Sequence, residues 1–406
     1  MKKSTIITVL AFTLGIVVLA AGFILLTDNN ISNSLFATTT TGTTTTPTTT
    51  RPVPDDVPMD LFSEDISKYI TFSYTDFVIE VENMEAAEEL IDLTIDQLLC
   101  FEKKYTEVNE GSVTDKVIFS FDYKGHHTNE DGTKGEAFDK GAGEYQLAYV
   151  DGDTLYVLVS DSTNGNYIST FIDGFAQGLR DKKPGDEFEL EITFPEDYGE
   201  ATLKGKKTIF DIKINYLTQT NLTDGWVKEY SKGKYNTCDE YREYIRKTIN
   251  DSYKNTNLNL LWAKIEESVV VKEIPKQQFD YYYNNQRYTI ETYAEQYGMT
   301  YESFLSFGGA AYLMGLNVYS DDDLIKSIND SIKSELVMAA ICQAEGIEAT
   351  DEEYELMIES FSEQYSMTKE QLIAAVGEEY FRTQVKYEKI DDVIYELNEF
   401  VLKTQE

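Results

Sequence analysis

The sequence predicts an α+β protein, with an antiparallel sheet and one short helix, then an all-α region, and an N-terminal transmembrane helix before both. Three features of the 406-residue chain support this architecture. An apolar run opens the chain, apolar residues alternate with polar ones in its middle, and from Thr220 onward they recur with helical spacing. Strand side chains alternate between two faces whereas a helix face repeats every 3.6 residues, so the change of period separates two folded regions.

The apolar run from Thr5 to Leu26 predicts an uncleaved membrane anchor. As a helix it would be about 33 Å long, enough to cross the hydrocarbon core. We favour an anchor over a removed signal, because a cleavable signal usually has an apolar core of about 7–15 residues. Lys2 and Lys3 precede the span and no positive residue follows it soon, so residues 1–4 are expected in the cytoplasm and the folded regions outside the cell.

Residues 27–58 are predicted to form an extended tether. Threonine occupies 11 of the 13 positions from Thr38 to Thr50, and this stretch offers no apolar side chains to bury. Such a segment holds a folded region away from the membrane.

The composition argues against several kinds of partner and site. A formal charge of −37 makes nucleic acid and anionic membrane surfaces poor partners. Cys100, Cys238 and Cys342 are too far apart for a zinc motif, so free buried thiols are expected, although one pair could bridge outside the cell. The only histidines, His126 and His127, are adjacent and are predicted to lie in an exposed loop. We therefore expect no histidine-based triad, no metal and no cofactor.

Residues 59–110 are predicted to lead into the sheet region rather than to form a domain. The stretch "TFSYTDFVIEVE" is extended in character, and Ala86 to Leu98 has mostly helical spacing.

Residues 111–218 are predicted to form the sheet domain. The alternating runs are Val117 to Tyr123, Phe188 to Phe194 and Ile209 to Tyr216, with Asp-Gly and Pro-Gly turn dipeptides between them. This pattern is typical of a half-buried antiparallel sheet. The apolar stretch from Tyr167 to Leu179 is predicted to be the short helix, preceded by a loop.

Residues 219–406 are predicted to form the all-α domain. Apolar residues between Tyr354 and Tyr365, and again between Ile390 and Val401, fall on single helical faces. Four helix starts are indicated by capping signatures. They are Thr237 with Glu240, Ser320 with Asp323, Thr350 with Glu353, and Thr368 with Gln371.

Several motifs in the sheet region resemble FKBP-type peptidyl-prolyl isomerases, in the family's order. They are "FDYKG" (121–125), "EAFDKG" (136–141), "FIDGF" (171–175), "GDEFELEITFPEDYG" (185–199) and "TIFDIKI" (208–214). "TFPEDY" followed by "LKGK" resembles the trigger factor form of this domain. In the helical region, "LTDGWVKEY", "VVVKEIPKQQFD" and "VIYELNEFVLKT" resemble the trigger factor C-terminal chaperone domain.

Two departures from the trigger factor pattern affect what the resemblance implies. The basic loop signature of the ribosome-binding domain is not found, and the anchor and tether stand in its place, so ribosome binding is not expected. Extra residues between Gly141 and Tyr167 leave open whether Tyr145, Tyr149 or Tyr156 lines the family's pocket.

The resemblance implies peptidyl-prolyl cis-trans isomerase activity, which needs no nucleophile. The barrier to amide rotation is about 18–20 kcal/mol, and an apolar site favours the twisted amide because it has lost most of its charge separation. The family pattern assigns eight site residues. Tyr123 and Phe138 are walls, Asp139 is the polar group beside the carbonyl, Phe171 and Ile172 form the rim, Phe175 lies beneath the proline, Tyr198 donates a hydroxyl, and Phe210 closes the back.

The expected function is a membrane-anchored, extracytoplasmic isomerase and chaperone whose partners are unfolded or newly exported polypeptides with X-Pro bonds. The alternative is a non-catalytic holdase that uses the FKBP-like domain as a scaffold or for client docking. Seven tyrosines between Phe279 and Phe304 suit promiscuous contact with clients, but packing in the helical core is an equally open explanation for them.

Overall fold

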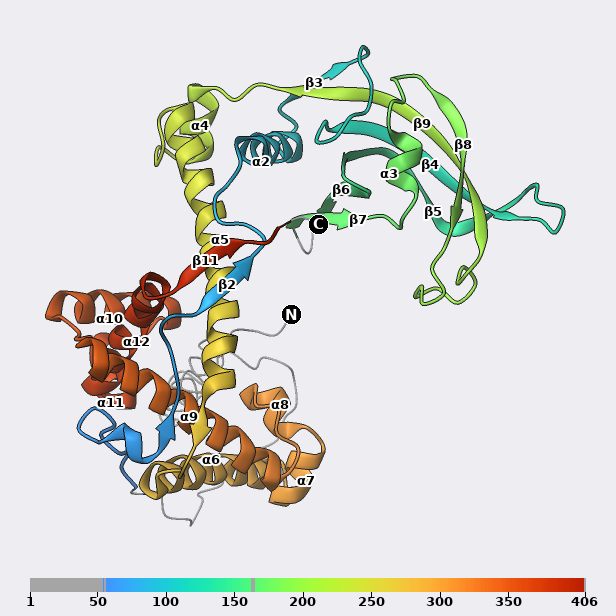
Figure 1. The fold of residues 1–406 in the computed structure, drawn as a ribbon. Helices are drawn as coiled ribbons and strands as arrows, with labels where there is room; N and C mark the ends of the chain where they lie inside the picture. Colours follow the sequence, from blue (N-terminus) through green and yellow to red (C-terminus); the bar gives the residue numbers. More distant parts are fainter. Residues whose placement is uncertain (1–53, 55, 162–164, 405–406) are drawn as a thin grey trace, which may run out of the picture. The chain divides into compact units, whose positions relative to one another are not determined.

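The computed structural model describes residues 54, 56–161 and 165–404 (Figure 1). These form two compact units: Asn83–Tyr253, here called the sheet unit, and the residues up to Glu82 together with Lys254–Glu406, here called the helical unit. The predicted anchor lies outside the described residues, as does the tether up to residue 53. In the described part of the chain, no helix is long and apolar enough to cross a membrane.

The sheet unit is built on one seven-stranded antiparallel sheet, which confirms the predicted sheet. Its strands are β3 (Tyr105–Val108), β4 (Phe119–Thr128), β5 (Lys134–Asp151), β6 (Thr154–Asp161), β7 (Gly165–Thr170), β8 (Glu187–Thr193) and β9 (Lys207–Thr220). Their order is β3-β9-β4-β5-β6-β7, and β8 pairs with β9. Its helices are α2 (Glu88–Phe101), α3 (Phe175–Leu179), α4 (Asp224–Tyr230) and the first part of α5 (Cys238–Ser268).

The two faces of this sheet are covered differently. Along β5, Ala148 and Val150 belong to the core that also contains α3, whereas Leu147 and Tyr149 pack in the cluster that contains Cys100 of α2. The opposite side of α2 packs against α4 and the start of α5. Strand alternation therefore places the α3 core on one face and α2 on the other (Figure 1).

Two local predictions in the sheet unit were wrong. The first half of the helix predicted at Tyr167–Leu179 is strand β7, because those residues pair with β6, and the helix itself begins only at Phe175. The histidines lie not in an exposed loop but on strand β4. The Nδ1 atom of His126 is 3.2 Å from the Gly135 carbonyl oxygen, and its Nε2 atom is 3.1 Å from Asp211 Oδ2.

The helical unit contains α6 to α12, the rest of α5, and several short elements. Its bounds are η1 (Ile66–Lys68), β1 (Ile70–Thr71), β2 (Val78–Val81), β10 (Val270–Val271), α6 (Lys276–Gln296), α7 (Tyr301–Ser306), α8 (Gly309–Met314), α9 (Asp321–Glu345), α10 (Asp351–Tyr365), α11 (Lys369–Val376), α12 (Glu378–Glu396) and β11 (Glu399–Leu402). β1 pairs antiparallel with β10, and β2 pairs parallel with β11. The region is thus helical with two small ladders.

The residues predicted as one lead-in segment divide between the units. Leu61, Ile70 and Val81 are buried in the main core of the helical unit, together with α6 and α9. Residues from Asn83 onward, including helix α2, belong to the sheet unit.

The predicted capping residues begin their helices. Thr350 and Thr368 form complete capping boxes at α10 and α11. The Ser320 hydroxyl accepts from the Asp323 amide at the start of α9, and the Thr237 hydroxyl accepts from the Glu240 amide at the start of α5. Each of these hydroxyls satisfies a backbone N–H that has no partner within the helix.

Most of the seven tyrosines between Phe279 and Phe304 pack into the helical unit. Tyr282 and Tyr301 are buried, four others are half-buried, and only Tyr297 is exposed. Their main role in this structure is therefore in the core.

Candidate functional site

Seven aromatic side chains of the sheet unit contact one another beside α3, and we call them the aromatic cluster. They are Tyr123, Phe138, Phe171, Phe175, Phe194, Tyr198 and Phe210. Six of them were predicted from the family pattern. The structure therefore brings together residues as far apart in the chain as Tyr123 and Phe210.

The cluster has a buried base and a partly exposed margin. Phe175, the first residue of α3, is 1% exposed, and Phe210 of β9 is 3% exposed. Their ring centroids are 4.9 Å apart with an interplanar angle of 68°. Tyr123, Phe138 and Phe171 are half-buried around them. The cluster thus has two buried rings at its base and three rings at its margin that are partly open to solvent.

Phe171 lies edge-on to two other rings of the aromatic cluster. Its centroid is 5.0 Å from that of Phe175 and 5.1 Å from that of Tyr123, with interplanar angles of 83° and 86°. Edge-to-face contacts of this kind are favourable for aromatic pairs. Phe171 thus partly covers Phe175, and a ligand that reaches Phe175 would have to displace the Phe171 ring.

Two glycines make room for the ring of Phe138. A Cβ atom added to Gly125 would lie 2.2 Å from Cζ of Phe138 and 2.7 Å from Cε1 of Phe210. A Cβ atom added to Gly141 would lie 2.2 Å from Cε2 of Phe138. Only glycine at both positions allows this ring to lie flat against β4 and β5 and to meet Phe210 edge-on at 5.7 Å.

The loop after β8 adds the last two rings. Phe194 continues the inward side of β8 and contacts Tyr198 at 4.7 Å and Phe138 at 6.1 Å. The Tyr198 amide donates to the Pro195 carbonyl, which closes the turn. Phe194 was predicted as a strand residue but not as a site residue. The signal was present, because it follows Ile192 by two positions and therefore faces the same side.

The hydroxyl of Tyr123 remains a proton donor at neutral pH. Burial raises the pKa of Tyr123, and the neighbouring Tyr198 raises it further. Two phenol groups therefore lie at the margin of an otherwise apolar cluster.

The two remaining predicted residues contact the cluster less directly. Ile172 is half-buried and packs against the same core. It precedes Gly174, whose φ of 97° lets the chain turn into α3. Asp139 is exposed on β5 beside Phe138, so its role stays a prediction.

The three candidate tyrosines of the insertion lie away from the aromatic cluster. Tyr149 and Tyr156 stack on each other at 4.9 Å in the core on the α2 side of the sheet. Tyr145 is 65% exposed, and its amide donates to Asp122. In the described part of this insertion, none of the three tyrosines lines the aromatic cluster.

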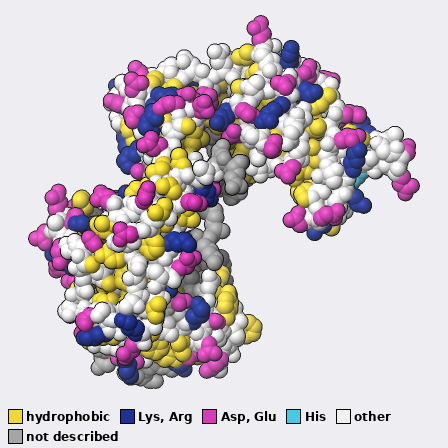
Figure 2. Space-filling view, viewed as in Figure 1, with side chains coloured by type: hydrophobic (Ala, Val, Ile, Leu, Met, Phe, Trp, Pro, Cys, Tyr) yellow, Lys and Arg dark blue, Asp and Glu magenta, His cyan; other side chains and the backbone are white. Residues whose placement is uncertain are grey.

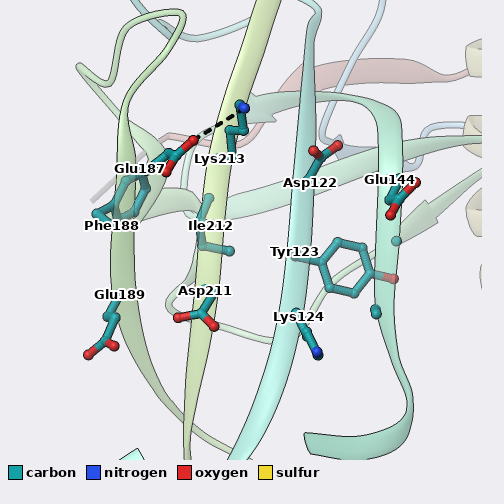
Figure 3. A pocket seen from close by; sticks show the side chains of 12 residues that line it. Asp122, Tyr123, Lys124, Glu144, Glu187, Phe188, Glu189, Asp211, Ile212 and Lys213 are labelled. Carbon is teal, nitrogen blue, oxygen red and sulfur yellow. Dashed lines mark ion pairs between the residues drawn. The ribbon is translucent and has the colours of Figure 1, made fainter.

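A concavity with a volume of about 530 Å³ lies over strands β4, β5, β8 and β9 (Figure 3). Five of its twelve lining residues are acidic, among them Asp122, Glu144 and Glu189, and Lys213 pairs with Glu187 at 3.2 Å. It shares only Tyr123 with the aromatic cluster. Among the residues that the structure describes, no group of three or more His, Cys, Asp or Glu side chains could hold a metal ion.

Comparison with known families matches both units. Residues 109–215 match the family model of the FKBP-type peptidyl-prolyl cis-trans isomerase, and residues 237–396 match that of the bacterial trigger factor protein C-terminus. The two matches follow one another in the chain without overlap.

Individual relatives agree with these matches. The chain is 28% identical to a trigger factor of Clostridioides difficile over 327 residues, which cover 78% of this chain and 69% of the relative. It is 26% identical to a trigger factor of Macrococcus caseolyticus over 335 residues, covering 79% and 70%. A solved structure described as "Promiscuous Substrate Recognition in Folding and Assembly Activities of the Trigger Factor Chaperone" aligns at 16% identity over 81% of this chain and 73% of that chain. Its TM-score of 0.31 is too low to bear on the fold.

Proposed function

We propose that this trigger factor-like chain, in which an FKBP-type domain precedes a trigger factor C-terminal domain, is a peptidyl-prolyl cis-trans isomerase and chaperone for exported proteins. The single observation that carries the catalytic part is the aromatic cluster, in which half-exposed rings surround the buried Phe175 and Phe210. Such a surface suits a proline ring and the apolar, twisted amide beside it.

The proposed mechanism makes and breaks no covalent bond to carbon. Twisting the X-Pro amide removes its resonance and most of its charge separation, so the transition state is less polar than either planar form. Rings such as Phe138, Phe171 and Phe210 replace water around the amide and favour the twisted form over the planar ones. The hydroxyls of Tyr123 and Tyr198 supply donors for neighbouring substrate carbonyls.

The helical unit would hold unfolded clients. Several large side chains there are widely exposed, including Phe307 at 82% and Tyr312 at 89%. Figure 2 shows apolar side chains exposed on this unit. Exposed aromatic side chains give apolar contact with little ordering cost, which suits many different clients.

The proposed location is the outer side of a membrane, with the chain held by Thr5–Leu26 and the tether. This rests on the apolar run, its length and the two lysines before it. We do not expect the protein to bind ribosomes, because the basic loop signature is not found in the sequence.

A non-catalytic holdase is the second candidate, and one observation favours it. Phe175 is almost fully buried, and the ring of Phe171 covers part of it. If Phe171 stays in place when a client binds, the cluster serves as a docking surface and not as a catalytic site.

A protease-coupled isomerisation assay with a proline-containing tetrapeptide separates the two candidates. We expect the full-length chain, kept in mild detergent, to accelerate isomerisation, and Phe175→Leu and Tyr123→Ala each to lower kcat/KM about tenfold, equal to about 1.4 kcal/mol of transition-state stabilisation. Suppression of aggregation of a proline-free client should be unchanged in both variants. If the wild-type chain isomerises the peptide no faster than the uncatalysed reaction but still suppresses aggregation, the holdase function is the one supported.

A further inference from the structure

Strand β7 forms one edge of the large sheet, because β6 is its only strand partner among the described residues. Its six residues, Gly165–Thr170, are mostly exposed, and Tyr167 is 44% exposed. The strand ends at Thr170, directly before Phe171 of the aromatic cluster. Within the part of the chain that the structure describes, this strand edge has no partner on its outer side and leads directly to the proposed active site.

The register shows which backbone groups face outward. In the β6–β7 ladder, Tyr156 lies opposite Thr170 and Leu158 opposite Ile168. The Phe171 amide continues this register and donates to the Leu155 carbonyl at 3.0 Å. Residues alternate along an antiparallel ladder between those that bond to the partner strand and those that point away from it.

Since Phe171 bonds to β6, Ser169 and Tyr167 do so too, whereas the amides and carbonyls of Asn166, Ile168 and Thr170 point away from β6. These outward groups recur at about 6.6 Å, twice the rise per strand residue. An extended peptide presents complementary groups at the same spacing.

β7 also lacks the features that usually protect a sheet edge. Natural edge strands carry charges, proline or bulges that discourage pairing with another chain. β7 reads GNYIST, with no charge and no proline, in a chain in which 26% of residues are charged. By contrast β8, whose only strand partner in the described sheet is β9, reads EFELEIT and carries three glutamates. Of these two edges, β7 is the unprotected one.

We propose that an extended segment of the substrate polypeptide adds to β7 as a further strand and so places its X-Pro bond at the aromatic cluster. The recognition uses the peptide backbone, so it would accept many sequences, as a folding factor requires. Continuity between Thr170 and Phe171 couples strand pairing to placement of the proline. This inference rests on the proposed function, and it assigns a substrate-docking role to the β6–β7 insertion.

Residue-resolved amide hydrogen exchange on the full-length chain tests the strand pairing directly. The probe is a peptide of about ten residues with one Ala-Pro bond, long enough at about 3.3 Å per residue to cover both β7 and the cluster. We expect the amides of Ile168 and Thr170 to exchange about tenfold more slowly with peptide, while those of Tyr167 and Ser169, already bonded to β6, change little. Equal protection of all four amides, or of none, would overturn the proposal. The proposal would also be overturned if the same alternating protection appeared without peptide and increased with protein concentration. The strand paired with β7 would then belong to a second copy of the chain.

A pair of variants at one position provides the functional test. Ile168→Pro removes one outward N–H and blocks pairing at an edge that tolerates proline, whereas Ile168→Ala keeps the amide and removes the side chain. We expect Ile168→Pro to raise KM for the long peptide about tenfold, with kcat/KM for a tetrapeptide unchanged and Ile168→Ala near wild type. If both variants change KM for the long peptide equally, the proposal is wrong.

The two tests also separate this inference from the proposed function. If the tetrapeptide is isomerised but the exchange pattern is absent, β7 docking fails and the isomerase stands. If the alternating protection appears but no substrate is isomerised, the docking strand stands and catalysis fails.

Discussion

In the sheet unit the rings of the aromatic cluster contact mainly one another, whereas in the helical unit the buried Tyr282 and Tyr301 end in hydrogen bonds to carboxylates. Tyr282 of α6 donates to Glu335 of α9, and Gln278 donates to the same carboxylate at 2.8 Å. Tyr301 donates to Asp321 at 2.6 Å, and Arg287 lies 4.4 Å from the Tyr301 ring.

This difference separates aromatic side chains that fix a fold from those that can receive a ligand. Each of these two tyrosines joins two helices, and moving Tyr282 would take a donor away from the buried carboxylate of Glu335, which is costly. The side chains of Phe171 and Phe138 carry no polar group that would lose a hydrogen bond if the ring moved. Their displacement therefore costs only apolar contacts, which an incoming proline ring would replace. The sequence pattern of the tyrosine-rich segment did not distinguish the two cases, because the distinction depends on partners on α9.

The largest expected effect comes from the buried carboxylate of Glu335. Burial raises the pKa of Glu335 to about 7, from an ordinary value of 4.5, although its bonds from Tyr282 and Gln278 act in the opposite direction. Between these two values the folded state binds more protons than the unfolded state. The free energy of unfolding therefore falls as pH rises through this window, by up to about 3 kcal/mol.

Glu335→Gln should remove this pH dependence. We expect urea unfolding of the variant, followed by helical circular dichroism, to lack the decrease that the wild type shows between about pH 5 and pH 8. Glu302→Gln, at an exposed position of α7, is the matched control and should keep the wild-type slope. If Glu335→Gln keeps that slope as well, the carboxylate is not the titrating group.

The second test adds one methyl group to the aromatic cluster. In Gly125→Ala the new Cβ would overlap the rings of Phe138 and Phe210, so one of them must move. We expect a loss of about 1–3 kcal/mol of stability and a fall of about tenfold in kcat/KM for a tetrapeptide. Gly225→Ala is the control, since a Cβ added there meets nothing within 4 Å. Wild-type activity in Gly125→Ala would show that the position of the Phe138 ring does not matter for catalysis.

The parts of the fold that the sequence predicted well are those with local signals. Alternation located β4, β8 and β9, and capping pairs such as Thr350 with Glu353 located helix starts, because hydroxyl and backbone partners are only three residues apart. The aromatic cluster was predicted through family motifs, and in the structure six of the eight predicted residues contact one another, while their role as a site stays a prediction. Phe194 was overlooked although its place in the alternation already put it on the inner face.

The parts that were missed depend on distant partners. Tyr167 and Ile168 read as helical until the insertion strand β6 is known to pair with them. The amide of Phe77 bonds to the side chain of Asn398, 321 positions away, and nothing local to residues 59–82 indicates that they join the helical unit. The membrane anchor at Thr5–Leu26 stays a prediction, because this segment lies outside the described residues.

The smallest expected effect tests a single hydrogen bond of the helical unit. Tyr301→Phe keeps the ring against Arg287 but removes the bond to Asp321, which retains the Tyr283 hydroxyl at 3.0 Å and Arg287 at 3.3 Å. Because two donors remain, we expect a loss of only about 1 kcal/mol in urea unfolding, with no change in tetrapeptide isomerisation. Tyr297→Phe, at a ring that is 60% exposed, is the matched control and should be neutral. If isomerase activity falls in Tyr301→Phe, the hydrogen-bonded tyrosines of the helical unit and the aromatic cluster are not functionally distinct, contrary to the comparison made above.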